Sequence, residues 1–177
     1  MRGFFVSVYC RAMQVAFQDG EVAFGVVGQV VLCFWRAPFT RLRLQTLKTI
    51  TLDTSRQYGR AATLGVFDSS AINLGAISDA GLRADATELA RSAVERGDGP
   101  LCTVIEGDGF GAAALRAAAT TIGMALPKTS NNRFSRDVSS AVEELVVALR
   151  LDEGMRAELL AGVAKLRAVT PKLVPVY

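Results

Sequence analysis

Residues 101–111 read LCTVIEGDGFG, and an alanine-rich run, residues 112–125, follows them directly. A short apolar run that ends in glycines and opens into small residues predicts a buried strand, a tight turn and a helix lying close to the sheet. These elements make one half of an α/β layer. We therefore expect the earlier segments to supply neighbouring strands and a covering helix, and the later ones to supply a return strand and further helices.

The residues before this stretch predict an antiparallel hairpin that leads into an interior strand. Asp19-Gly20 separates two runs of β-forming residues, which is a two-residue turn signature. The run Val30–Trp35 is apolar at every position. That pattern is typical of a strand covered on both faces.

The segment 39–56 carries two competing patterns. Leu44 and Leu47 keep helical spacing, whereas Leu42 and Leu44 alternate as in a strand, and several threonines favour a strand. Residues 61–67 read as the next strand, and a parallel strand pair needs a crossover element between its members. We therefore expect a helix in this segment.

The last part of the chain predicts one short strand and two capped helices. Residues 131–134 allow an edge strand, and Asp137 and Asp152 stand at N-cap positions of the helices that follow. The last helix carries an apolar stripe made of Met155, Leu159, Val163 and Leu166. A terminal helix needs a surface for its apolar face, so the stripe packs on its own domain or, alternatively, forms a homodimer interface. Residues 170–177 predict an irregular tail.

Composition narrows the class of protein. The chain has 177 residues, of which 50% are hydrophobic and 21% charged, which fits one ordinary globular domain without a membrane span. The net charge of +3 is not concentrated in a basic block, so we expect no nucleic-acid partner and no membrane partner. The three cysteines predict free thiols in a cytoplasmic protein. The absence of histidine removes the commonest general base and most zinc sites. An enzyme here would need carboxylates, serine, lysine or a cofactor, and because no catalytic set is complete we expect no enzyme, no metal and no cofactor.

Two segments carry a likeness to known proteins: residues 104–110 (VIEGDGF) running into residues 113–116, and Phe134 followed by Asp137 and residues 141–149. They resemble the third strand and last helix of a divergent STAS-like group in bacteria of high GC content, the superfamily of anti-sigma-factor antagonists. The resemblance implies an α/β fold with a mixed sheet of about four to five strands, an antiparallel N-terminal hairpin, helices covering the sheet and an extra C-terminal helix. The domain would cover residues 13–150, with an extension at 1–12 and a helix and tail at 151–177. Met13 is an alternative start to Met1.

The same resemblance implies a non-catalytic domain that binds another protein, in bacterial signalling or partner switching. In the antagonists a strand ends in Asp-Ser-Ser-Gly or Asp-Ser-Thr-Gly, and the second hydroxyl residue is phosphorylated. Asp68-Ser69-Ser70 occupies the matching strand end here, with Ala71 in place of the glycine. Ser69 and Ser70 are therefore candidate switch residues, although Asp and Ser are also ordinary turn and capping residues.

The glycine-rich turn is a second candidate site. Gly107, Asp108, Gly109 and Gly111 approximate a dinucleotide-binding loop, in which backbone N–H groups approach a phosphate. The loop stands late in the chain, and Asp108 would set a negative charge beside a pyrophosphate. A plain tight turn is the competing interpretation. The alternative function is a small-molecule or nucleotide-binding α/β protein, possibly an enzyme, that uses this loop.

Overall fold

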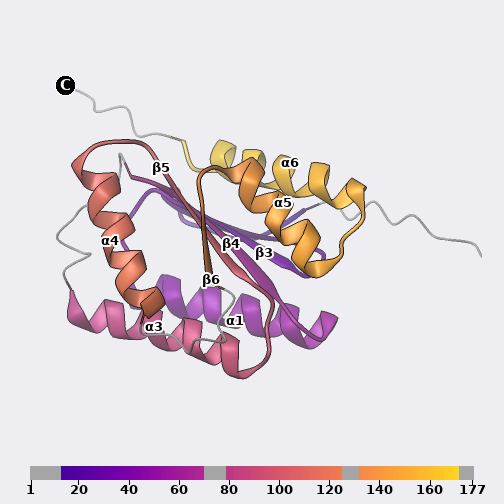
Figure 1. Cartoon of the computed structure of the whole chain (residues 1–177), viewed down its shortest axis with the longest axis horizontal. Helices are drawn as coiled ribbons and strands as arrows, with labels where there is room; N and C mark the ends of the chain where they lie inside the picture. Colours follow the sequence, from indigo (N-terminus) through magenta and orange to yellow (C-terminus); the bar gives the residue numbers. More distant parts are fainter. Residues whose placement is uncertain (1–12, 70–78, 125–131, 172–177) are drawn as a thin grey trace, which may run out of the picture.

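A computed structural model describes residues 13–69, 79–124 and 132–171 (Figure 1). They form a six-stranded sheet whose spatial order follows the chain, β1-β2-β3-β4-β5-β6. The first three strands are antiparallel and the later ones add in parallel. The strands are β1 (Gln14–Gln18), β2 (Val22–Val27), β3 (Val30–Trp35), β4 (Ala62–Asp68), β5 (Leu101–Glu106) and β6 (Asn132–Ser135). The α/β class and the N-terminal hairpin are confirmed, but the sheet has six strands where about four to five were expected.

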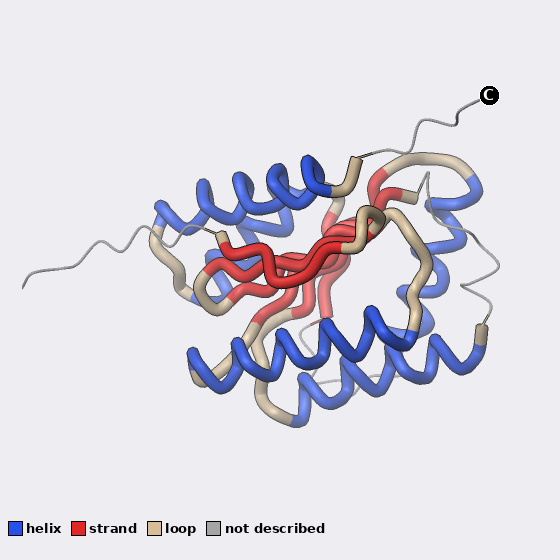
Figure 2. Tube along the Cα trace, turned by 180° about the vertical axis from the view of Figure 1, so that it is seen from behind, coloured by secondary structure: helices blue, strands red, loops and turns tan. Residues whose placement is uncertain are grey.

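Helices cover both faces of this sheet (Figures 1 and 2). They are α1 (Arg41–Tyr58), α3 (Ala80–Glu95), α4 (Phe110–Met124), α5 (Val138–Leu149) and α6 (Glu153–Val169). The three helices that connect parallel strands lie on one face, and α5 and α6 lie on the other. Right-handed crossovers that step in one direction across a sheet place their helices on the same side, which explains this division.

The segment with two competing patterns is helix α1. Its N-cap Thr40 accepts a hydrogen bond from the backbone N of Arg43 at 3.2 Å. Leu44 and Leu47 are buried, whereas Leu42 is 68% exposed, so the helical spacing identified the inward face and the alternation did not. The predicted caps of the last two helices are confirmed, since Asp137 accepts from Ser140 N at 2.8 Å and Asp152 from Met155 N at 3.0 Å.

The main core lies between the sheet and α5 and α6. Leu32 and Leu64 on the sheet and Leu145 on α5 have no exposed surface. The stripe of α6 belongs to this same cluster, with Met155, Leu159, Val163 and Leu166 all buried. These four side chains are buried in the chain's own core, as the first of the two interpretations expects, and a homodimer through them stays a prediction.

Candidate functional site

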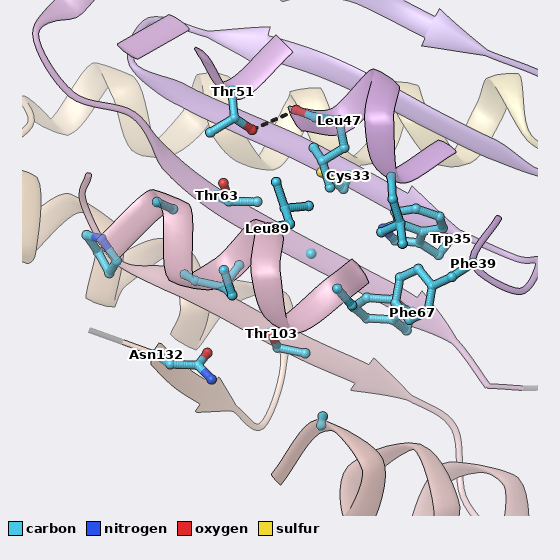
Figure 3. Close-up of a pocket in the computed structure, with 18 of the residues that line it drawn as sticks. Cys33, Trp35, Phe39, Leu47, Thr51, Thr63, Phe67, Leu89, Thr103 and Asn132 are labelled. Carbon is cyan, nitrogen blue, oxygen red and sulfur yellow. Dashed lines mark hydrogen bonds between the residues drawn. The ribbon is translucent and has the colours of Figure 1, made fainter. Parts of the chain in front are cut away.

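A cavity of about 410 Å³ lies on the opposite face, between the sheet and α1, α3 and α4 (Figure 3). Its floor is the face of β3 to β6 that points toward α3, and its wall is mostly apolar. Pockets that hold small molecules span about 300–1,000 Å³ and have mainly apolar linings with a few polar groups. The cavity has the size and character of such a pocket.

The cavity exists because small side chains meet small side chains. Cys33, Gly65 and Thr103 are register neighbours on β3, β4 and β5 and form one row across the floor. Above them α3 contributes Ala86 and Ala90 to the lining. Space is left where these small residues face each other, beside larger lining residues such as Leu82 and Leu89 of α3, whereas the other face of the same strands carries leucine, valine and phenylalanine and is filled.

Aromatic rings close one end of the cavity. Trp35 stacks on Phe67 with ring centroids 5.9 Å apart and meets Phe39 edge-on at 4.9 Å. All three rings line the cavity and lie together in Figure 3. Aromatic pairs of this kind hold their geometry well, so this end is a rigid apolar wall.

Asp98 fixes another part of the lining, in the turn between α3 and β5. Its carboxylate accepts hydrogen bonds from Ser55 Oγ at 2.7 Å, from the backbone N of Ala61 at 3.2 Å and from Arg96 Nη2 at 2.8 Å. The side chain is only 3% exposed. These bonds join the end of α1, the start of β4 and the turn, and they engage both oxygens of the carboxylate.

The cysteines of the described residues are buried, free thiols. Cys33 lies in the cavity floor, and burial raises the pKa of its thiol. Cys102 points into the filled core of the other face, and burial raises its pKa to about 11. A raised pKa leaves little thiolate at neutral pH, so neither residue is suited to nucleophilic chemistry. Cys10 lies outside the described residues.

The two candidate sites predicted from sequence lie next to each other. The backbone N of Ser69, at the end of β4, donates to the carbonyl of Glu106 at 3.1 Å. A Cβ placed on Gly107 would lie 2.5 Å from Ser69 Oγ, and one on Gly111 would lie 3.4 Å from the carbonyl of Ser69. Ser69 is buried with its hydroxyl close to Gly107, and Asp108 is exposed. Ser70 lies outside the described residues.

Arg116 closes the turn from the α4 side. Its Nη2 donates to the carbonyls of Ile105 and Gly107, at 3.2 and 3.1 Å. The carbonyl of Gly107 in the turn is therefore already bonded to the guanidinium of Arg116. Gly107 and Gly109 have φ of 93° and 86°, which is the conformation the glycine spacing predicted for a tight turn.

The strand ends also carry a balanced set of charges on the α6 side. Asp68 pairs with Arg36 at 3.2 Å, and Glu106, its register neighbour, pairs with Arg167. Both guanidinium groups lie over the ring of Phe34, at 5.0 and 5.8 Å from its centroid. Each carboxylate is paired with its own arginine, so we interpret this cluster as a structural one that stabilises the C-terminal ends of β4 and β5.

Other classes of site find little support in the part of the chain that the structure covers. Residues 13–69, 79–124 and 132–171 contain no group of three or more histidine, cysteine or acidic side chains arranged to hold a metal ion. Among the described helices, none has the length and apolar character needed to cross a membrane. No protein-family model, no curated protein and no solved structure matches the chain.

Sequence reasoning missed the cavity. The feature of the sequence that could have indicated it is a small or weakly polar residue in the middle of each of three otherwise bulky strands: Cys33, Gly65 and Thr103. Their effect depends on the register that places them side by side, which no single strand reveals.

Proposed function

We propose that this chain is a non-catalytic cytoplasmic binding domain that holds a small, mainly apolar molecule in the cavity between the sheet and α3. The observation that carries the proposal is the hollow of about 410 Å³ over the row Cys33, Gly65 and Thr103. The hollow is partly open to solvent and its lining is mainly apolar, so an apolar molecule that enters it removes apolar surface from water. Burial of that surface favours binding of a molecule with an apolar body.

The proposal places small-molecule binding in the cavity and not in the glycine-rich turn. The Ser69 hydroxyl lies close to Gly107 of that turn, and Arg116 donates to the carbonyls of Ile105 and Gly107. The cavity, in contrast, is lined by aromatic rings and by alanine and leucine residues of α3. Apolar contact with a few polar groups is what small-molecule sites provide.

A filled cavity tests this proposal. Ala86 lines the cavity on α3, and Ala86→Phe is expected to abolish the binding of octanol measured by titration calorimetry, because the ring takes the ligand's place. Unfolding in urea should change by less than about 1 kcal/mol, since the ring enters empty space. Ala84→Phe is the control, because Ala84 is exposed on the same helix and outside the cavity lining. Octanol binding that survives in both variants would contradict the proposal.

A second candidate function is the protein-binding role that the STAS-like resemblance implies. Phe110 favours it: this residue begins α4 directly after the turn that contacts Ser69, and its side chain is 80% exposed. Phenylalanine is one of the side chains that are enriched at protein–protein interfaces. Phe110→Ala is expected to lose at least tenfold in affinity for a protein captured from native lysate, while octanol binding stays unchanged. Equal capture by both forms would count against this role.

A further inference from the structure

The exposed points of the cavity lining show where a bound molecule meets water. Among the described residues that line the cavity, Arg83, Gly97 and Phe134 are exposed. Of these three, Arg83 carries the charge. An amphiphile buries its apolar body and keeps its head group hydrated, because an unpaired polar or charged group is costly to bury. The residues at the exposed points therefore decide which head group the cavity favours.

Helix α3 places Arg83 at the aromatic end of the cavity. This helix leads from the C-terminal end of β4 back to the start of β5, so its first turns lie near the C-terminal strand ends. Trp35 and Phe67 stand near those ends. Arg41 at the start of α1 confirms the placement, since its Nε lies 3.3 Å from Oδ2 of Asp85, two residues beyond Arg83. Figures 1 and 2 show α1 and α3 side by side.

The cavity extends from this end along the strands. Thr63, Gly65 and Phe67 alternate along β4 and all line it, which corresponds to a length of about 13 Å at the rise of a strand. At the other end the lining includes the apolar residues Pro100 and Leu101. The space therefore suits an elongated apolar body with its head group at the Arg83 end.

The second charged residue of the described lining is balanced within the chain. The Asp98 carboxylate is 3% exposed, and Arg96 Nη2 donates to it at 2.8 Å. Its other oxygen accepts from Ser55 Oγ and from the backbone N of Ala61. A ligand in the cavity therefore meets the positive charge of Arg83 more readily than the negative charge of Asp98.

The acidic residue one helical turn before Arg83 has a structural role of its own. Asp79 caps α3, and its Oδ1 accepts from the backbone N of Gly81 at 2.7 Å and of Leu82 at 3.0 Å. A guanidinium carries five N–H donors, more than one carboxylate engages. Arg83 can therefore bind a ligand beside a contact with its own chain.

We infer that the cavity selects an amphiphile with a carboxylate head group, an inference that rests on the proposed function. Its alkyl body lies over Gly65 and against the rings of Trp35 and Phe67. Its carboxylate stays at the exposed edge of the cavity and accepts hydrogen bonds from the guanidinium of Arg83, whose planar fork matches a carboxylate. An ammonium head group in the same place would meet a like charge.

Titration calorimetry with three probes tests this inference. Nonanoate, octanol and octylammonium carry the same octyl chain, and their head groups are anionic, neutral and cationic at neutral pH. At low salt, nonanoate is expected to bind about tenfold more tightly than octylammonium, because an exposed opposite charge favours binding and a like charge opposes it by a similar factor. This ratio should fall as salt is added. Equal affinities for the two ions, or tighter binding of octylammonium, would overturn the inference.

Two variants assign the preference to Arg83. Arg83→Gln removes the charge and keeps most of the side chain, so the affinities for the two ions should come within about twofold of each other, while octanol binds as before. Arg91→Gln is the matched control, because Arg91 is exposed on the same helix and outside the described lining, and its replacement removes the same charge. It should keep the tenfold ratio. A tenfold ratio that survives in Arg83→Gln would overturn the inference.

The two proposals fail in different ways. If none of the three probes binds the wild-type chain, the cavity is not a binding site and the proposed function fails. If all three bind equally and Ala86→Phe abolishes their binding, the cavity binds apolar molecules and only the head-group inference is wrong. Nonanoate that binds Ala86→Phe as tightly as the wild-type chain would show that it is held outside the cavity, which also overturns the inference.

Discussion

Gly162→Val is expected to lower the free energy of unfolding by about 3 kcal/mol, the upper range for overpacking a dense core. Gly162 lies on α6 where this helix meets the sheet. A Cβ there would lie 2.6 Å from Cδ1 of Leu32 and 3.1 Å from Sδ of Met13. Leu32 has no exposed surface, so its end cannot move aside without disturbing the core. Urea unfolding followed by circular dichroism measures the effect.

Ala161→Val provides the control for this substitution. Ala161 is the neighbouring residue and is exposed, so it tests the cost of a valine in α6 without the clash. We expect a change within about 1 kcal/mol. Leu32→Ala combined with Gly162→Val should cost less than the two single changes added together, because the smaller side chain makes room. Equal midpoints for the two valine variants would show that α6 does not lie against β3 as described.

Gly107→Ala is expected to cost about 3 kcal/mol, from backbone strain together with a steric clash. Gly107 has φ of 93°, a backbone conformation that residues with a side chain rarely adopt. An added Cβ would lie 2.5 Å from Ser69 Oγ. Urea midpoints of the variant and the wild-type chain check this value.

Gly109→Ala separates the two causes. Gly109 has φ of 86°, and a Cβ there would meet nothing within 4 Å. Gly109→Ala should therefore lower the free energy of unfolding only by the backbone strain, about 1 kcal/mol. Ser69→Gly in the Gly107→Ala background should recover most of the difference. If the two alanine variants are equally stable, Ser69 does not pack into the turn, and a ligand-binding role for residues 107–111 becomes the better interpretation.

Local sequence patterns predicted the elements well where one physical cause dominated. Val30–Trp35 is apolar at every position because both faces of β3 are covered, and all six residues are buried. Asp137 and Asp152 marked helix starts because their carboxylates accept backbone hydrogen bonds. The spacing of Met155, Leu159, Val163 and Leu166 identified an apolar helix face. It did not identify the covering surface, which proved to be the chain's own sheet.

The candidate site could not be predicted in the same way, because it depends on distant residues. In the sequence Gly65 is a single small residue of β4, and only the strand register shows that it lies between Cys33 and Thr103. Asn132 begins a four-residue edge strand, and nothing local shows that it will line a cavity. Ser69 and Gly107 were recognised separately, but their contact follows only from the pairing of β4 with β5.

Trp35 allows the most direct test of a ligand-binding cavity. It is the single tryptophan of the chain and lines the cavity, and bromine quenches indole fluorescence only at close contact. Titration with bromo-octanol is expected to give saturable quenching of Trp35 that octanol reverses and that Ala86→Phe abolishes. Quenching that rises linearly without saturation, to the same extent in the wild-type chain and in Ala86→Phe, would contradict the account.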